Sequence, residues 1–356
     1  MRILLLGGTG AMGAHLTELL NEKSEVEYVY VTSRKPYADK ARIKYLEGNA
    51  KDITFLRTVL SINHWDCIVD FMTYTCEELN NRISLLLSSC DQYIFLSSAR
   101  CYAGSSERIT ENTPYLVDSV SDIDYLSTNE YGLEKGRSEK LIKSSGLNWT
   151  IVRPYITYSE NRLQLGVYEK EEWLYRALHG RTIVFSKDIA NKMTTLTYGY
   201  DVAMGISKLI GNFESLGQSY HITQTESIKW SKILEYYQNA IEKFTGKRPA
   251  VFFEETCGNL KYPQRCYQVK YDRLFDRSFD STKIGAYIDL NSFINTEAGI
   301  FKCISAFVNN QRWKTINWLD EARKDKLTGD FTPLREINGY KQRIKYILCR
   351  FFNICI

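Results

Sequence analysis

Tyr131 and Lys135 are the residues of this chain whose types and spacing best fit proton chemistry. Four residues apart on a helix, they lie on one face. An ammonium beside a phenol favours the phenolate, so Tyr131 can exchange a proton with a sugar or alcohol hydroxyl, and Lys135 can also hold a cofactor ribose. Many surface helices carry this pattern by chance, with a solvated Tyr and Lys. What surrounds the helix decides between the two interpretations.

A glycine-rich turn near the N-terminus supplies one part of that surrounding. The apolar stretch 2–6 predicts a buried strand and leads into Gly7-Gly8-Thr9-Gly10-Ala11-Met12-Gly13, which opens an amphipathic helix. This order is a dinucleotide-binding fingerprint. Gly7 permits the tight turn, Gly10 lets the backbone approach a pyrophosphate, and Gly13 lets the helix pack closely on the sheet.

Ser98 supplies another part. It follows the stretch 93–97, which predicts a strand, and so stands at the sheet edge where doubly wound folds bind ligands. Its hydroxyl can hydrogen-bond a reacting oxygen, or it can satisfy backbone groups of the loop. Because the glycine turn, the serine and the Tyr–Lys helix follow in the order expected of one site, we interpret Ser98, Tyr131 and Lys135 as a catalytic set.

The end of the second predicted strand bears on the choice of cofactor. An acidic residue there accepts hydrogen bonds from the ribose of NAD, whereas this chain has Thr32-Ser33-Arg34. Space and a positive charge at Ser33 and Arg34 suit the 2′-phosphate of NADP, which we therefore prefer. Alternatively, Arg34 lies over the adenine or in solvent and the cofactor is NAD.

The elements that must position these residues alternate along the first part of the chain, which predicts an α/β fold with a Rossmann-type, doubly wound parallel sheet. From residue 155 the pattern becomes irregular and predicts a smaller, interleaved C-terminal substrate lobe. We expect a dinucleotide-binding domain over 1–154 with part of 195–225, a mainly substrate-binding lobe over 155–339, and a tail over 340–356. Strands are expected at 2–6, 27–32, 43–46, 67–71, 93–97 and 149–153, and helices at 13–22, 79–89, 131–144, 171–178, 202–210 and 229–244.

The composition is that of an ordinary globular protein, with 44% hydrophobic and 25% charged residues. A net charge of +4 is too small and dispersed to predict a nucleic-acid groove. Nine cysteines without a C-x-x-C pair argue against a disulfide framework. The four histidines show no metal-ligand spacing, so no metal is expected. No charged leader or membrane-spanning apolar stretch is present, and we expect a cytoplasmic location.

The tail departs from this average. Its cations meet no acidic residue, while its apolar residues recur at helical spacing. Such a basic amphipathic helix can lie on an anionic membrane, or it can dock its apolar stripe on the protein body or on a second subunit. The cations are Lys341, Arg343, Lys345 and Arg350, and the apolar residues are Tyr340, Ile344, Ile347, Leu348, Phe351 and Cys355.

The chain resembles the extended short-chain dehydrogenase/reductases, specifically the NAD-dependent epimerase/dehydratase family. The resemblance covers about residues 1–300 and rests on the glycine turn and six further motifs. These are Gly48-Asn49-Ala50-Lys51-Asp52, Ser97-Ser98-Ala99-Arg100-Cys101-Tyr102, Ile109-Thr110-Glu111-Asn112-Thr113-Pro114, Tyr131-x-x-x-Lys135, Arg153-Pro154 and Tyr200-Asp201-Val202-Ala203. The resemblance implies catalysis by Ser98, Tyr131 and Lys135, an adenine beside Asn49 and Ala50, a nicotinamide beside Tyr155, and a homodimer. The expected cofactor-binding residues are Gly7, Thr9, Gly10, Ala11, Met12, Gly13, Ser33, Arg34, Asn49, Ala50, Phe71, Lys135 and Tyr155.

Two departures from the family narrow the expected activity. Its dehydratases carry an Asp-Glu pair where this chain has Ala99-Arg100, so dehydration is not expected. Its epimerases often carry an Asn for the substrate diphosphate where this chain has Ile156, which weakens the case for a nucleotide sugar. The expected activity is NAD(P)-dependent epimerisation of a sugar or nucleotide sugar through a keto intermediate. The alternatives are an NADPH-dependent ketosugar reductase and, from another class, a non-catalytic dinucleotide-sensing or RNA-associated relative.

Overall fold

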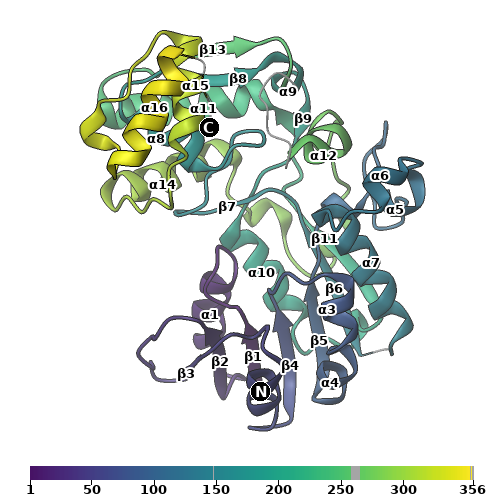
Figure 1. The fold of residues 1–356 in the computed structure, drawn as a ribbon. Helices are drawn as coiled ribbons and strands as arrows, with labels where there is room; N and C mark the ends of the chain where they lie inside the picture. The colour runs from purple at the N-terminus through teal and green to yellow at the C-terminus, as the bar shows by residue number, and fades with distance from the viewer. Residues whose placement is uncertain (147, 258–264, 353, 355–356) are drawn as a thin grey trace. The chain divides into compact units, whose positions relative to one another are not determined.

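The computed structural model describes residues 1–146, 148–257, 265–352 and 354, and the chain divides into two compact units (Figure 1). Unit 1 comprises 1–159, 195–227 and 276–296, and unit 2 comprises 160–194, 228–275 and 297–356. Three segments differ from the expected division. Residues 155–159 and 276–296 belong to unit 1 rather than to the substrate lobe, and the tail 340–356 is part of unit 2.

Unit 1 is built on a seven-stranded sheet in the order β11-β6-β5-β4-β1-β2-β3, and every neighbouring pair is parallel. The doubly wound α/β fold expected from the sequence is therefore confirmed, with one additional strand, β11. The strands are β1 Arg2–Leu6, β2 Tyr28–Ser33, β3 Ile43–Glu47, β4 Trp65–Asp70, β5 Cys90–Leu96, β6 Trp149–Pro154 and β11 Gln218–Ile222.

Both faces of the sheet are buried, which explains why its strands are apolar throughout. Alternate residues of β1 face opposite ways. Ile3 and Leu5 pack in a core with α1 (Gly13–Asn21) and α10 (Gly199–Leu209). Leu4 and Leu6 pack in a second core with α2 (Ile53–Leu60), α3 (Cys76–Asn80), α4 (Ile83–Ser88) and α7 (Tyr131–Ser144).

Local signals set the helix ends. Asp52 caps α2 by accepting from the backbone N–H groups of Thr54 and Phe55, at 2.8 and 2.9 Å. The helix expected over 79–89 is two shorter helices, α3 and α4. The first begins earlier than expected because Thr75 and Glu78 form a capping box at its N-terminus. Unit 1 also contains α5 Leu116–Ser119, α6 Ile123–Leu126, α13 Thr282–Gly285, the paired β7 Thr157–Tyr158 and β10 Thr197–Tyr198, and the short 3₁₀ turns η1 Ala99–Cys101, η2 Phe213–Ser215 and η6 Leu290–Ser292.

Unit 2 is mainly helical, with the pairs β8–β13 and β9–β12. Tyr346 and Cys349 of the tail helix pack against Trp318 and Ala322. None of the helices among the described residues is long and apolar enough to cross a bilayer. Seven cysteines in the described part of the chain are free thiols. The elements are α8 Lys170–Leu178, β8 Ile183–Ser186, α9 Lys187–Ala190, β9 Met193–Thr194, β12 Ile228–Lys229, α11 Trp230–Thr245, β13 Val251–Glu254, α12 Cys266–Gln268, the π-helical turn η5 Val269–Arg273, α14 Thr296–Asn309, α15 Trp318–Thr328, η7 Leu334–Glu336 and α16 Tyr340–Phe352.

Candidate active site

The residues expected to bind cofactor or substrate all belong to unit 1 and follow the carboxyl ends of its parallel strands or begin α7. Ligands of doubly wound sheets bind at this edge. Gly7 follows β1, Arg34 follows β2, Asn49 follows β3, Phe71 follows β4, Ser98 follows β5 and Tyr155 follows β6.

The glycine turn has the backbone that its sequence requires. Gly7 has φ +71°, and its N–H donates to Thr32 Oγ1 at 2.8 Å, which ties the turn to the end of β2. A Cβ on Gly13 would lie 2.6 Å from the Gly8 carbonyl oxygen, so only glycine allows this approach of α1. Around Gly10 a Cβ would meet nothing within 4 Å. The turn therefore leaves open space beside Gly10, with the N-terminus of α1 close by.

The first residue of α10 also contacts the glycine turn. A Cβ on Gly199 would lie 2.4 Å from the carbonyl oxygen of Ala11, so the first residue of α10 touches the turn backbone. Met12 precedes α1 and is within 3.8 Å of the Thr157 hydroxyl, while Thr9 is exposed. Gly199 was not among the expected site residues, although it directly precedes the Tyr200-Asp201-Val202-Ala203 motif.

The ends of β2 and β3 form the next part of the edge. Ser33 is buried, and its hydroxyl oxygen accepts from the Lys35 N–H at 3.1 Å, whereas Arg34 is exposed. The Gly48 N–H donates to the Ser33 carbonyl at 2.8 Å and brings Asn49 and Ala50 beside the end of β2. Asn49 Oδ1 accepts from the Lys51 N–H at 3.1 Å, and Ala50 is buried.

Sequence reasoning missed two residues that contact expected site residues: Met72, beside Gly7, and Phe279, beside Tyr155. Met72 follows Phe71 and packs over the glycine turn, since a Cβ on Gly7 would lie 2.7 Å from the Met72 sulfur. The buried Tyr155 ring lies 5.1 Å from the ring of Phe279, which belongs to the late segment 276–296 of unit 1. Only adjacency to Phe71 signalled Met72, and no local pattern signalled Phe279.

Tyr131 and Lys135 both face the end of β5. Tyr131 opens α7 and is 36% exposed, while Lys135 is buried one turn later. Lys135 Nζ donates to the Leu96 carbonyl at 2.6 Å and lies 4.5 Å from the Phe95 ring centroid and 5.8 Å from the Tyr131 ring centroid. The ammonium thus stands between the phenol and the carboxyl end of β5.

Ser98 lies in the turn that packs on the start of α7. Its hydroxyl oxygen accepts from the Arg100 N–H at 3.2 Å and caps η1. A Cβ on Gly132 would lie 2.8 Å from the Arg100 carbonyl oxygen, so glycine at this position lets α7 approach the turn. The structure therefore brings the serine turn, the phenol and the ammonium to the same end of β5.

Arg100 and Glu130 form a pair at the site that sequence reasoning did not predict. The Arg100 guanidinium lies 5.4 Å from the Tyr131 ring centroid and forms an ion pair with Glu130. Glu130 also caps α7 by accepting from the Gly132 N–H at 2.7 Å and accepts from the Tyr125 hydroxyl at 3.0 Å. Glu130 directly precedes Tyr131, a position from which a helix cap could have been inferred.

A buried ion pair links Glu139 of α7 to Arg153 of β6. Arg153 Nε donates to both carboxylate oxygens of Glu139, at 2.9 and 3.1 Å, and Ser97 and Tyr115 also donate to this carboxylate. Burial raises the pKa of Glu139, but the guanidinium and these hydrogen bonds outweigh it and hold the pKa below its ordinary value. The pair joins α7 to β5 and β6.

Asp70 is a second buried carboxyl near the site, at the end of β4. It accepts from the Met72 N–H and from the Tyr93 hydroxyl, both at 2.9 Å. Burial raises its pKa to about 6, and the two hydrogen bonds lower it only in part.

Comparisons with known proteins agree with this architecture. The model of the NAD dependent epimerase/dehydratase family matches residues 3–223, and the chain belongs to that family. The dTDP-glucose 4,6-dehydratase of Bacillus anthracis, solved with NAD, is 15% identical, with a TM-score of 0.65 over 88% of this chain and 98% of that one. The UDP-glucuronic acid 4-epimerase of Bacillus cereus, also with NAD, is 15% identical, with a TM-score of 0.64 over 88% and 100%. At such identities these likenesses show the fold alone.

One relative found by sequence is named for binding stem-loops rather than for an enzymatic activity. The chloroplast stem-loop binding protein of 41 kDa b of Arabidopsis thaliana is 24% identical over 235 residues, which cover 62% of this chain and 58% of that protein. The chain therefore spans less than two thirds of the length of this relative.

Proposed function

We propose that this protein is an NAD(P)-dependent epimerase of a sugar or nucleotide sugar that acts through a keto intermediate. The observation that supports the proposal is the convergence of Ser98, Tyr131 and Lys135 at the carboxyl end of β5, on the same edge of the sheet as the glycine turn after β1. Hydride chemistry on a sugar needs a group that exchanges a proton with a hydroxyl, and Tyr131 is the partly exposed phenol at that place.

The residues at the edge fit a dinucleotide. The open space beside Gly10 and the N-terminus of α1 suit a pyrophosphate, and the exposed Arg34 suits a 2′-phosphate, so we propose NADP before NAD. When bound, such a cofactor supplies reversible hydride transfer at a sugar carbon. Titration with both dinucleotides tests the preference, and Arg34→Ala is expected to weaken NADP binding while leaving NAD binding unchanged. Equal affinities in the wild-type chain would reject the preference.

Three side chains act in the proposed reaction. Tyr131 takes the proton from the sugar hydroxyl at Oη and returns it, Ser98 Oγ hydrogen-bonds the same substrate oxygen, and Lys135 stabilises the phenolate electrostatically. Dehydration is not part of the proposal, because Arg100, in the segment where dehydratases carry their acid and base, is engaged by Glu130.

Tyr131→Phe tests the assignment. General acid–base catalysis is worth about 10²–10⁴-fold, so we expect a loss of that size in turnover with dinucleotide affinity unchanged. A panel of nucleotide sugars is incubated in deuterated solvent with labelled cofactor, and mass spectrometry reads hydrogen exchange at C4. Tyr37→Phe, at an exposed tyrosine, is the matched control. Wild-type turnover by a folded Tyr131→Phe variant would show the assignment to be wrong.

A ketosugar reductase uses the same site and differs in the fate of the ketose. Stoichiometric nicotinamide in the purified protein supports the epimerase, because epimerases recycle a tightly held cofactor. Consumption of NADPH with a 4-ketosugar supports the reductase.

The resemblance to a stem-loop binding protein favours one candidate of another class, a non-catalytic dinucleotide-sensing or RNA-associated relative. Filter binding of a stem-loop RNA, compared with its unfolded single strand, tests it. Binding of the stem-loop without any conversion in the sugar panel would replace the enzyme proposal.

A further inference from the structure

The tail helix α16 presents part of its apolar stripe, Tyr340, Ile344 and Phe351, to solvent. It docks on unit 2 through Tyr346 and Cys349, and the Tyr346 hydroxyl donates to Asp325 Oδ2 at 2.7 Å. Of the predicted stripe, Tyr340, Ile344 and Phe351 lie on another face, 77%, 40% and 56% exposed, whereas Ile347 and Leu348 are half-buried. The stripe therefore docks on this unit only in part, through Ile347, while Tyr346 and Cys349, which lie outside the predicted stripe, are the buried attachments of the helix.

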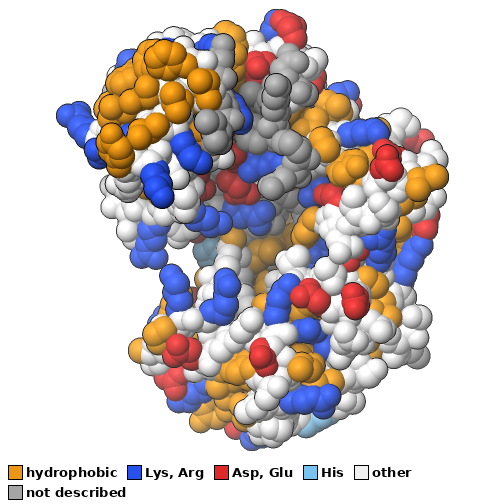
Figure 2. Space-filling model, viewed as in Figure 1, with side chains coloured by type: hydrophobic (Ala, Val, Ile, Leu, Met, Phe, Trp, Pro, Cys, Tyr) orange, Lys and Arg blue, Asp and Glu red, His pale blue; other side chains and the backbone are white. Residues whose placement is uncertain are grey.

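The exposed apolar side chains are contiguous. The Phe331 ring, 49% exposed, lies 6.4 Å from the Phe351 ring, and Phe352 is 64% exposed. We call Phe331, Tyr340, Ile344, Phe351 and Phe352 the tail patch. Figure 2 shows a hydrophobic cluster bordered by Lys and Arg where Figure 1 places α15 and α16. Contiguous exposed apolar surface marks an interaction site.

Cations flank the stripe along both sides of α16. Helical spacing places Lys341 and Lys345 on one side and Arg343 and Arg350 on the other, and α16 contains no acidic residue. Arg343 donates to the Ile337 carbonyl and Arg350 to the Asp330 carbonyl, so both stay beside the patch.

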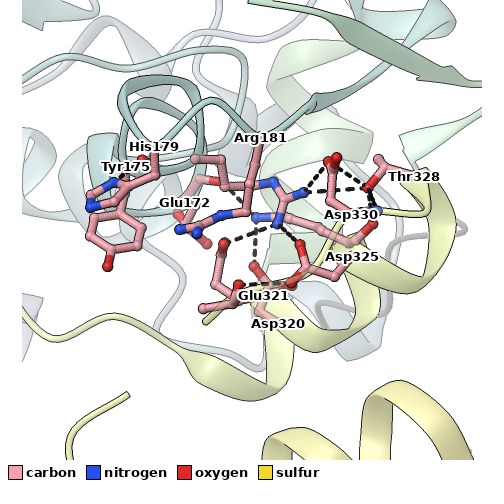
Figure 3. A network of polar contacts seen from close by, with 12 residues as sticks. Glu172, Tyr175, His179, Arg181, Asp320, Glu321, Asp325, Thr328 and Asp330 are labelled. Atoms are coloured by element: carbon pink, nitrogen blue, oxygen red, sulfur yellow. Dashed lines mark hydrogen bonds and ion pairs between the residues drawn. The ribbon is translucent and has the colours of Figure 1, made fainter. Parts of the chain in front are cut away.

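The acidic residues of the neighbouring helix α15 turn inward and do not offset these cations. Glu321 and Asp325 contact Arg176 at 3.0 and 2.8 Å, and Asp320 contacts Lys324 at 2.6 Å (Figure 3). All three carboxylates are buried. Exposed positions of α15 include Arg323 and Lys326.

Two further carboxylates near the patch form ion pairs with arginines of unit 2. Asp330 contacts Arg176 at 3.3 Å, and Glu336 contacts Arg181 at 2.9 Å. In the described part of the tail region, the solvent-facing charges are thus mainly positive, around an aromatic and aliphatic stripe.

We propose that the tail patch binds the surface of an anionic membrane, with α16 lying in the plane of the interface. An outward apolar stripe with cations on both flanks is the geometry of interfacial helices, whose apolar side chains enter the acyl boundary while Lys and Arg meet anionic headgroups. A second copy of this chain would place the same cations against one another, which disfavours a symmetric contact through this patch. The proposal does not depend on the catalytic assignment.

Vesicle flotation of the full chain tests the proposal. We expect the protein to float with vesicles containing phosphatidylserine, to stay behind with pure phosphatidylcholine, and to be released by high salt. Phe351→Ser/Phe352→Ser removes two exposed apolar side chains and should lower the partition coefficient on the order of tenfold. Lys341→Gln/Lys345→Gln should lower it by a similar factor on anionic vesicles.

Matched control variants distinguish binding through the tail patch from nonspecific adsorption to vesicles. Ile123→Ser/Phe213→Ser removes two exposed apolar side chains of unit 1, and Lys243→Gln/Lys247→Gln removes two exposed lysines of unit 2. Both should float like the wild type. The proposal is overturned if the full chain does not float, if the control variants lose as much binding, or if light scattering shows that Phe351→Ser/Phe352→Ser only dissolves a dimer.

Discussion

Ile156 is the residue at which sequence and backbone disagree most. It has φ +36°, and no other described residue apart from glycine has a positive φ. A β-branched side chain is strained there, whereas Asn tolerates this region. The resemblance drawn from the sequence implies an Asn at this position, and an Asn would adopt this backbone conformation with less strain than Ile156. Backbone strain of this kind points to a functional position.

Ile156→Asn is expected to gain affinity for UDP. One additional hydrogen bond to the diphosphate is worth roughly 0.5–1.5 kcal/mol, or up to about tenfold in affinity. Ile156→Leu keeps the apolar volume without an amide and serves as the control. Isothermal titration with UDP measures both variants, and equal affinities for wild type, Asn and Leu would show that this position does not meet the diphosphate.

Asp70 predicts a pH dependence of stability. The carboxyl has a pKa of about 6 when folded and about 4 when unfolded, so between these values the folded chain binds more protons. Raising the pH through that window therefore lowers the free energy of unfolding, by on the order of 2–3 kcal/mol in total, and the contribution is constant above it. The pKa is raised, so the stabilising form is the protonated one at low pH.

Asp70→Asn should remove this part of the pH slope. Urea unfolding between pH 4 and 7 measures the free energy of unfolding, and the difference between wild type and variant should change across the window and then level off. Asp124→Asn, at an exposed carboxyl, should keep the wild-type slope. Parallel slopes for wild type and Asp70→Asn would contradict the prediction.

At the scale of elements, the position of α7 depends on the buried Glu139–Arg153 pair. Glu139→Gln leaves the guanidinium buried without its charge partner, and breaking such a pair costs about 3–5 kcal/mol. Asp118→Asn breaks an exposed ion pair between Asp118 of α5 and Lys140 of α7. This variant should change the free energy of unfolding little. Urea unfolding compares the two variants. A small loss for Glu139→Gln would mean that the pair does not fix α7 on the sheet.

Elements with strong local signals could be predicted from the sequence. The glycine turn and α7 lie where the sequence patterns predict them, because residues close together in the sequence determine their backbone conformation and apolar spacing. Contacts between distant segments could not be predicted in this way. Arg100 with Glu130, Gly199 on the turn, and Phe279 beside Tyr155 depend on how the chain returns to the sheet.

The tail shows the same limit. Its helix and its charge pattern were predictable, but the face that docks was not. Tyr346 anchors α16 through a hydroxyl bonded to a buried aspartate of α15, and an apolar stripe gives no sign of such a partner.

At the scale of the whole molecule, the chain passes repeatedly between its two units, after residues 159, 194, 227, 275 and 296. Unit 1 is therefore completed by segments that come late in the sequence. Strand β11 forms one edge of the sheet beside β6, and α10 packs with α1 in the core that contains Ile3 and Leu5.

This interleaving predicts that the fragment 1–159 does not fold alone. Without α10 and β11, the core loses Val202, Ile206 and Tyr220, and the sheet face that α1 and α10 cover together keeps only α1. Each large apolar side chain of this kind contributes about 1.5–3 kcal/mol when buried, so losing several is comparable to the whole net stability of an ordinary domain, about 5–15 kcal/mol. Circular dichroism under increasing urea should show no cooperative transition for the fragment and a clear one for the full chain. A cooperative transition of the fragment would mean that the first six strands and their helices form a self-sufficient core, with the late segments added to a finished sheet.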